Sequence, residues 1–525
     1  MAAAPYEGLS EAGPRAHLIE DGVGRARSQP AQPERTLHLA ASMLAASAGR
    51  YFWGAALVVA VLGGAAAGLH LPTSGDSFVH IATGRLIESR GFFGTSSFMA
   101  GTRAPLDLRS WLLDLGLAHL YSWGGIGLLE ILAALIGAAT GTLLWFAIRL
   151  AGKAHPVMAM VGLALGLAAL DPVVTSLPAG VMALLSAALV LSLVGLRRDR
   201  SWAPWALLAV ILVWAQADSF VVVVAPLTAV ALLLMDRRNG RPPSWLLAVG
   251  VMVASCINPQ GPMIYSLIPY SLGMSGESPL LPLFGSPDFH PWGARLSELT
   301  ALALLLGYLL AGQRAGRSWG LLALATAVMA LLWSAYLPLF LVVAGFQAAV
   351  LLSWWAADLT ERHPASARSV APRGRVLLAS AAVPALLSLA LLGHAADEAA
   401  ASGGPQGQLA RVLPVAASSW LRAHPIPGVW YTTPDFGDYL AARDPTQGRL
   451  VCTTDPVADG PARMSACEQL AVLNQGALSI LGRLRVEVAV LPAAAPEVAF
   501  LRAEGWSIRY RDATSVVLTA NPSVR

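Results

Sequence analysis

The sequence predicts an all-α membrane bundle followed by a small soluble α/β domain. Hydrophobic residues make up 56% of the 525 residues and charged residues only 13%, whereas soluble proteins carry roughly 25% charged residues. Long apolar runs recur from residue 51 onward, and the composition becomes more polar after residue 403. We therefore expect a disordered cytoplasmic tail at residues 1–50, a polytopic membrane domain at 51–395 and an external α/β domain at 403–525.

The apolar runs predict about eleven membrane-spanning helices, some of them short, because a helix of about 20 residues crosses a hydrocarbon core. The first of these runs is Tyr51–Leu71. The others are Ile126–Ile148, Val157–Leu170, Leu177–Leu196, Trp202–Ala217, Phe220–Met235, Trp245–Ile257, Leu296–Ala311, Trp319–Trp333, Leu337–Trp355 and Val376–Leu392.

The basic residues predict the orientation of these helices. With the N-terminal tail in the cytoplasm, every basic loop falls on the cytoplasmic side, as the positive-inside rule requires. The loop at residues 72–110 and everything after Gly393 then lie outside. We expect a multi-pass protein of the bacterial cytoplasmic (inner) membrane, in contact with membrane lipid, with its C-terminal domain in the periplasm or outside the cell. Short basic clusters between apolar runs do not indicate a nucleic-acid partner.

The external loop at residues 72–110 is the main functional candidate, because ionisable groups at a membrane surface are costly unless they have a task. Apolar residues within Ser77 to Arg90 have helical spacing, which predicts an amphipathic helix lying in the membrane interface. Trp111 to Trp123 is expected to form a second short surface helix that ends at Gly124-Gly125.

Asp76, His80 and several arginines are the candidate site residues in this loop. Asp76 and His80 are four residues apart and would share a helical face, where His80 can orient Asp76 or share a proton with it. Simpler interpretations stay open: Asp76 as a helix N-cap, His80 as a hydrogen-bonded interfacial residue, and the arginines as ligands of lipid headgroups. The arginines are Arg85, Arg90, Arg103 and Arg109.

The C-terminal domain is expected to alternate strands and helices around a mainly parallel sheet that ends in a hairpin turning at Asp512-Ala513. It lacks a glycine-rich phosphate loop, which favours a binding or lid module. Cys452 and Cys467 lie on the oxidising side of the predicted topology, so we expect a disulfide between them. The expected strands are Val429–Thr432, Leu450–Thr453, Val486–Leu491, Ser507–Arg511 and Ser515–Thr519, and the expected helices are Phe436–Arg443, Ala466–Leu484 and Pro496–Glu504.

Short motifs in a particular order resemble the GT-C superfamily of integral-membrane glycosyltransferases, and more narrowly an uncharacterised bacterial GT-C-like group with an external C-terminal α/β domain. The order of the motifs is more specific than any one of them. They are Gly75-Asp76-Ser77-Phe78-Val79-His80 with Thr83-Gly84-Arg85, Trp214-Ala215, Asn258-Pro259-Gln260-Gly261, Ser286-Pro287-Asp288-Phe289, Leu337-Pro338-Leu339-Phe340 and Asp435-Phe436-Gly437-Asp438-Tyr439-Leu440.

The resemblance implies transfer of a sugar from a polyprenyl-phosphate-linked donor to an external cell-envelope or protein acceptor. Asp76 would be the catalytic base, assisted by His80. The guanidinium groups of Arg85, Arg103 and Arg109 would bind the lipid phosphate through bidentate hydrogen bonds. A divalent cation held by Asp76 with Asp171 or Asp218 stays open, although no close pair of carboxylates in the sequence supports a metal site.

Departures from the motifs of the group support a second hypothesis. The group would have tryptophans at Phe78 and Val79, an Arg-Pro at Asp171-Pro172, and an Asn-x-His at Gln216–Asp218. These changes favour a catalytically inactive membrane scaffold or complex subunit, whose C-terminal domain binds membrane-protein partners. A transporter is a third hypothesis, which we favour least because the chain shows no inverted repeat.

Overall fold

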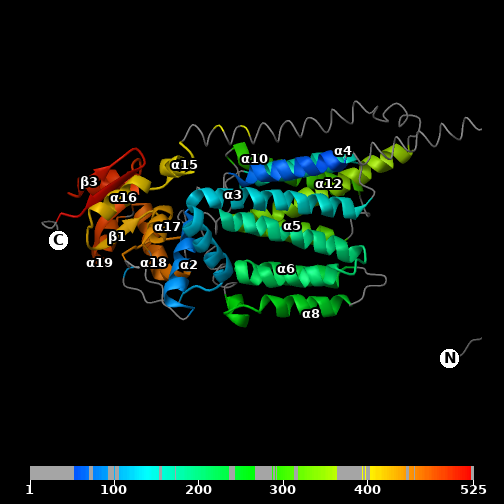
Figure 1. The fold of residues 1–525 in the computed structure, drawn as a ribbon, viewed down its shortest axis with the longest axis horizontal. Coiled ribbons are helices and arrows are strands. Elements are labelled where there is room, and N and C mark those ends of the chain that lie inside the picture. The colour runs from blue at the N-terminus through cyan, green and yellow to red at the C-terminus, as the bar shows by residue number, and fades with distance from the viewer. Residues whose placement is uncertain are drawn as a thin grey trace, which may run out of the picture. The chain divides into compact units, whose positions relative to one another are not determined.

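The computed structural model describes a set of apolar helices and a small four-stranded sheet (Figure 1). Residues 1–50, Arg103 and the expected span Val376–Leu392 lie outside the described residues. The described residues are 53–69, 75–92, 100, 106–152, 156–171, 173–235, 243–266, 287, 290, 292–311, 317–362, 393, 397, 403–444, 449–454, 456–473 and 475–521.

The helical part begins with a helix at Trp53–Gly68. It continues with α2 (Asp76–Arg90), α3 (Trp111–Ala151), α4 (Pro156–Leu170), α5 (Leu177–Arg197), α6 (Ala203–Ala217), α7 (Val221–Leu233), α8 (Ser244–Ser255), η2 (Gly261–Ser266), α10 (Trp292–Ala311), α11 (Arg317–Leu332), η5 (Ser334–Tyr336) and α12 (Leu337–Arg362). In Figure 1 the helices α3, α5, α6 and α8 lie side by side, and their contacts follow the same order.

Three described segments are long and apolar enough to cross a membrane: Trp111–Ala151, Leu177–Arg197 and Ser334–Ala356. Other expected spans correspond to apolar helices of only 10–17 residues. The described residues therefore support a helical membrane bundle but do not establish eleven spans. The shorter helices are Trp53–Gly68, Met158–Leu170, Ala203–Ala217, Val221–Leu233, Ser244–Ser255 and Ser318–Leu332.

The expected surface helix at Trp111–Trp123 is not separate from the span that follows it. Both belong to α3, which is interrupted at Gly125, where φ is 60° and ψ is −149°. This backbone conformation is readily available only to glycine. The predicted boundary at Gly124-Gly125 is thus a kink within one long helix rather than the end of a helix.

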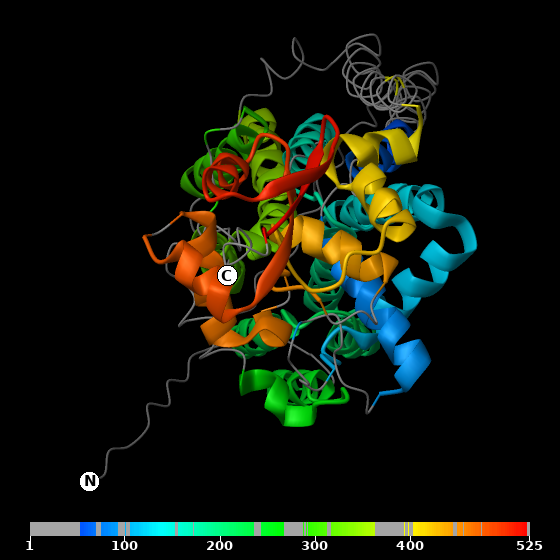
Figure 2. The same ribbon diagram turned by 90° about the vertical axis from the view of Figure 1, so that its left-hand side faces the viewer.

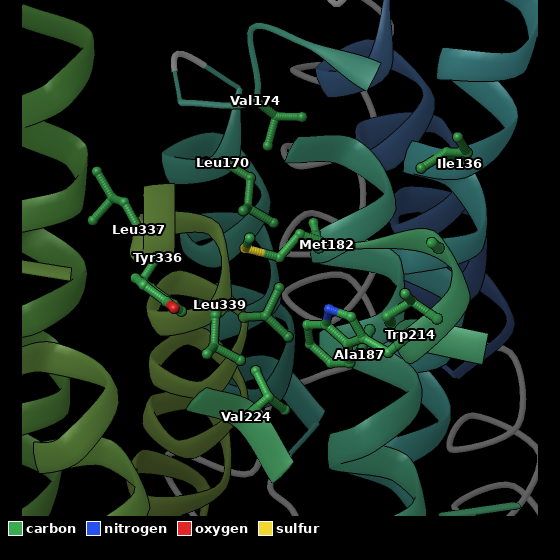
Figure 3. Packing of buried hydrophobic residues seen from close by; sticks show 14 of the residues in the cluster. Ile136, Leu170, Val174, Met182, Ala187, Trp214, Val224, Tyr336, Leu337 and Leu339 are labelled. Atoms are coloured by element: carbon green, nitrogen blue, oxygen red, sulfur yellow. The ribbon is translucent and has the colours of Figure 1, made fainter. Parts of the chain in front are cut away.

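Buried apolar side chains fill the spaces between the bundle helices (Figure 3). Ile136, Met182 and Trp214 come from three different helices and belong to the same buried cluster. Small residues allow the helices to approach closely elsewhere, since a Cβ atom on Gly137 would collide with the backbone of Gly64. Such small-residue contacts are typical of helix pairs in membranes.

Helix α2 is present as expected, but its apolar side packs against protein. Phe78, Ile81 and Leu86 are fully buried, and α2 contacts α3 on one side and α17 (Pro434–Arg443) of the C-terminal part on the other. Figure 1 shows α2 between these two helices. The expectation that the apolar face of this helix lies in the membrane interface is therefore wrong.

The C-terminal part consists of short helices around one sheet, seen in Figure 2 with its strands toward the viewer. Its helices are α15 (Pro405–Val412), α16 (Val415–Ala423), α17 (Pro434–Arg443), α18 (Pro456–Ala471), α19 (Ala477–Arg483) and α20 (Pro496–Ala503). Its strands are β1 (Val429–Thr432), β2 (Val486–Pro492), β3 (Ser507–Arg511) and β4 (Ser515–Thr519).

The strand order is β1-β2-β4-β3, with β1 and β2 parallel and the other two pairs antiparallel. The expectation of a mainly parallel sheet is wrong, because the C-terminal hairpin places β4 beside β2 in the opposite direction. Leu450 makes only a single bridge to Trp430 instead of a strand. The expected helix Ala466–Leu484 is divided into α18 and α19.

The predicted disulfide between Cys452 and Cys467 is present. It joins the segment after Leu450 to α18, and both cysteines are buried in the smaller apolar core beside the sheet. The third cysteine, Cys256, is a free thiol.

Candidate functional site

The N-terminal end of α2 is fixed by contacts on two sides. The backbone N–H of Gly75 donates a hydrogen bond of 3.1 Å to Oδ1 of Asp435. The hydroxyl of Ser77, one residue beyond Asp76, accepts a hydrogen bond of 3.1 Å from the backbone N–H of Leu177 at the start of α5. These bonds hold the beginning of α2 between the helical bundle and the C-terminal part.

Two glycines allow the close approach that these bonds require. A Cβ atom on Gly75 would collide with Cα of Asp435, and a Cβ atom on Gly84 would collide with the carbonyl group of Asp114. Helix α2 therefore packs directly on the backbone of α3 and on the start of α17. The sequence offered no sign of these contacts beyond the glycines themselves.

Asp76 is the first residue of α2, and its side chain is partly exposed, at 17%. The N-cap residue is Gly75, which has no capping side chain. The interpretation of Asp76 as the N-cap is therefore wrong, although a carboxylate in the first turn still interacts favourably with the helix dipole.

His80 connects Asp76 to a carboxylate that the sequence analysis did not single out. Its Nδ1 atom lies 2.5 Å from Oδ1 of Asp114, and its Nε2 atom lies 4.0 Å from Oδ1 of Asp76. The hydroxyl of Ser110 donates to Asp114 at 3.2 Å and lies 3.4 Å from His80 Nδ1. A 4.0 Å separation is too long for a hydrogen bond, so His80 acts on Asp76 through its charge.

The surroundings of His80 favour its charged form. Burial alone would lower the pKa of His80, but the hydrogen bond and the charge of Asp114, with the charges of Asp76 and Asp218, raise it to about 9. His80 is thus a cation at neutral pH, flanked by carboxylates.

Asp218 follows the last residue of α6 and is 8% exposed. Its Oδ1 accepts a hydrogen bond of 3.0 Å from the backbone N–H of Phe220. Burial raises the pKa of Asp218 to about 6, against the opposing effects of this hydrogen bond and of the charge on His80. Its neighbour Gln216 accepts a hydrogen bond of 2.8 Å from Nε1 of Trp111 at the start of α3.

The described arginines of the predicted phosphate site are both engaged with protein groups. Arg109 donates two hydrogen bonds to the carboxylate of Asp107, one from Nε to Oδ1 at 2.7 Å and one from a terminal nitrogen to Oδ2 at 2.6 Å. Arg85 donates to the carbonyl oxygen of Ala442 at the end of α17, and its guanidinium lies 5.4 Å from the centre of the Tyr121 ring.

The motif Asp435–Leu440 forms the contact surface of α17. The ring of Tyr439 lies 5.1 Å from that of Phe78 on α2, edge to face. Asp438 is completely buried and accepts two hydrogen bonds from Thr454, from the backbone N–H at 3.1 Å and from the hydroxyl at 2.6 Å. Burial raises the pKa of Asp438 well above its usual range, and these hydrogen bonds oppose the rise.

No protein-family profile and no curated protein matches the chain. Among solved structures, the chain resembles the oligosaccharyltransferase of Archaeoglobus fulgidus tethered to an acceptor peptide with the NVT sequon. The TM-score is 0.52 and the identity 11%, over 90% of this chain and 74% of the other. The chain has a GT-C fold.

A second match is the crystal structure of ArnT from Cupriavidus metallidurans bound to undecaprenyl phosphate. Its TM-score is 0.46 and its identity 14%, over 90% of this chain and 98% of the other. The GT-C resemblance from motif order is confirmed at the level of the fold by the likeness to the oligosaccharyltransferase alone.

Sequence reasoning missed Asp114 as a member of the site within this GT-C fold. It was assigned to a surface helix, yet it is 1% exposed and bonded to His80. The available signal was a single carboxylate within the apolar segment Trp111–Leu117. Among the described residues, no group of three or more histidines, cysteines and acidic residues is arranged to hold a metal ion.

Proposed function

We propose that the chain is a glycosyltransferase that uses a polyprenyl-phosphate-linked sugar and acts on an external cell-envelope or protein acceptor. The GT-C fold, shared with an oligosaccharyltransferase, supports this class of reaction. The observation that carries the proposal is the arrangement of Asp76, His80 and Asp114, in which a partly exposed carboxylate lies beside a buried and anchored imidazolium.

Asp76 would act as the general base. An acceptor hydroxyl or amide would lose a proton to the Asp76 carboxylate as its oxygen or nitrogen forms a bond to the anomeric carbon of the sugar. The bond from that carbon to the phosphate oxygen breaks, and the electron pair leaves with the lipid phosphate. The positive charge on His80 would offset negative charge as the phosphate departs.

Arg85, Arg103 and Arg109 remain the proposed contacts of the lipid phosphate. Arg85 belongs to α2, the helix that begins with Asp76, and Arg109 lies just before the start of α3. The proposed membrane domain at residues 51–395 would lie in the cytoplasmic membrane with the start of α2 outside. The proposed external domain at 403–525 would then present the acceptor, since α17 adjoins the start of α2.

The test is transfer of label from a radiolabelled polyprenyl-phosphate sugar pool into membranes that contain the wild-type chain or the Asp76→Asn variant. We expect incorporation by the wild-type chain and a loss of at least about 100-fold in the variant, the size of a typical general-base contribution. The matched control is Glu88→Gln, an exposed carboxylate on the same helix whose partner, His119, is also exposed. This control should retain wild-type incorporation.

A second candidate function is that of an inactive scaffold or complex subunit. The observation in its favour is that Arg85 and Arg109 already bind protein groups, with Arg109 held by both oxygens of Asp107. If none of the lipid-linked sugars is incorporated above background by the wild-type chain, the scaffold becomes the better hypothesis. Equal incorporation by the wild-type chain and Asp76→Asn would instead exclude Asp76 as the base.

A further inference from the structure

A cavity of about 200 Å³ lies in the C-terminal part, and its lining includes neither Asp76, His80 nor Asp114. It is lined by the side of α16 and the end of α17, together with Trp430 of β1 and the segment that begins at Arg449. Three of its lining residues are arginines, Arg422, Arg443 and Arg449, and Asp444 adds one carboxylate. The cavity therefore has an excess of positive charge.

The guanidinium groups of Arg443 and Arg449 are held in place by neighbouring groups. Nε of Arg443 donates a hydrogen bond of 3.0 Å to the Tyr439 hydroxyl. A terminal nitrogen of Arg449 donates one of 3.1 Å to the carbonyl oxygen of Ile426, and its guanidinium lies 5.6 Å from the centre of the Trp430 ring. A guanidinium has five N–H donors, so each of these arginines keeps further donors after its observed bond. Fixed donors of this kind reduce the entropic cost of binding an anion.

The indole of Trp430 forms one wall of the cavity. Trp430 is only 7% exposed, and its Nε1 atom is buried with no hydrogen-bond partner in the described part of the chain. Trp430 therefore contributes the face of its ring to the cavity, on which the guanidinium of Arg449 lies.

We propose that this cavity binds an oxyanion, a phosphate or carboxylate group, and that the part of the ligand inside the cavity is no larger than a single sugar. The N–H groups of arginine are all donors, so they match a group that only accepts hydrogen bonds. The volume lies below the range of about 300–1,000 Å³ for drug-sized ligands, which limits the occupant to a small group. Leu421, Leu440 and Leu450 supply apolar walls for the carbon framework.

The experiment uses the full-length chain in phosphatidylcholine nanodiscs and measures heat of binding for inorganic phosphate, glucuronate and glucose. We expect phosphate, glucuronate or both to bind and glucose not to bind, because glucose has the ring without the charge. Preference between the two anions identifies the group. Loss of phosphate binding when phosphatidylglycerol is added to the nanodisc would identify a lipid headgroup as its source, and unchanged binding would identify a soluble ligand.

The variants Arg449→Gln and Arg422→Gln each remove one charge from the cavity and should weaken anion binding about tenfold or more. Arg422 is an exposed residue, so its variant tests the cavity even if Arg449→Gln fails to fold. The control is Arg502→Gln, an exposed arginine of α20 outside the cavity. The proposal is overturned if neither anion binds, if glucose binds as well as glucuronate, or if the cavity variants behave like Arg502→Gln. Because binding is measured and not transfer, this inference stands or falls separately from the proposed enzyme.

Discussion

Nδ1 of His80 lies 2.5 Å from Oδ1 of Asp114, so one hydrogen bond joins α2 to α3 where the two helices are in backbone contact. The pair is buried more deeply on the Asp114 side, at 1% exposure against 19% for His80. Breaking a buried pair by removing one partner is expensive because the other charge remains without compensation.

The stability of the protein should depend on the protonation of His80. Its pKa is raised from 6.5 to about 9 by Asp114 against the lowering effect of burial, so the folded state binds the proton more tightly than the unfolded state. The resulting stabilisation is complete below the unfolded pKa and is lost as the pH rises through the folded pKa. We expect the Tm of the wild-type chain to fall over this interval. In His80→Gln the fall should be smaller, and parallel Tm curves for the two proteins would contradict the assignment.

Asp114 is expected to be a positioning residue whose removal changes the pH dependence of transfer. In Asp114→Asn the group that raises the pKa of His80 is lost while His80 stays buried, so that pKa should fall. The alkaline limb of the pH–rate profile should then move to lower pH by at least about one unit. A merely structural role would lower the rate at every pH without moving the limb.

Gly75→Ala should destabilise the contact between α2 and α17. The added methyl group collides with the backbone of Asp435, and such overpacking costs about 1–3 kcal/mol. Thermal unfolding and limited proteolysis of the C-terminal part measure the effect. The control is Gly116→Ala on α3, where a Cβ atom meets nothing within 4 Å, and this variant should be as stable as the wild-type chain or slightly more so.

Asp438 and Thr454 should be energetically coupled. Asp438→Ala leaves both Thr454 donors without their acceptor, which we expect to cost about 1–3 kcal/mol. Thr454→Val removes only the hydroxyl and should cost less. In a double-mutant cycle the coupling energy should reach about 1 kcal/mol or more, and additive effects would show that the two residues act independently.

The disulfide between Cys452 and Cys467 should stabilise the C-terminal part. Its cysteines are 15 residues apart, a loop length for which chain entropy gives about 3 kcal/mol. The double variant Cys452→Ala, Cys467→Ala should therefore unfold at a lower temperature. Alkylation of the denatured wild-type chain without reductant should modify Cys256 alone, and modification of all three cysteines would contradict the bond.

Much of the fold could be predicted from local patterns. Apolar periodicity located most helices of the bundle, and β-branched runs such as Val486–Leu491 and Ser515–Thr519 located the principal strands. The direction of β4 could not be inferred this way, because the strand pattern is the same in parallel and antiparallel sheets. At Gly125 the sequence predicted the end of a helix, where the structure has a kink. A glycine pair indicates that the helix is interrupted but does not show whether it continues afterwards.

The candidate site could be predicted only in part, because some of its members meet through tertiary contacts. Asp76 and His80 are four residues apart, so helical spacing alone predicts that they are neighbours. Asp114 reaches His80 only because Gly84 lets two helix backbones touch, which is a tertiary contact. The hydrogen bonds of Arg85 to Ala442 and of Arg109 to Asp107 also could not be predicted, because residue type does not show which groups meet in the fold.

The position of α2 between α3 and α17 limits how the chain can be divided. A truncation before residue 403 would expose the ring of Phe78 and leave the amide of Gly75 without Asp435. A chimera that exchanges only the C-terminal part would bring a foreign surface against the same glycine and phenylalanine. A functional chimera must therefore exchange the matching face of α2 together with α17, because the two helices form one interface.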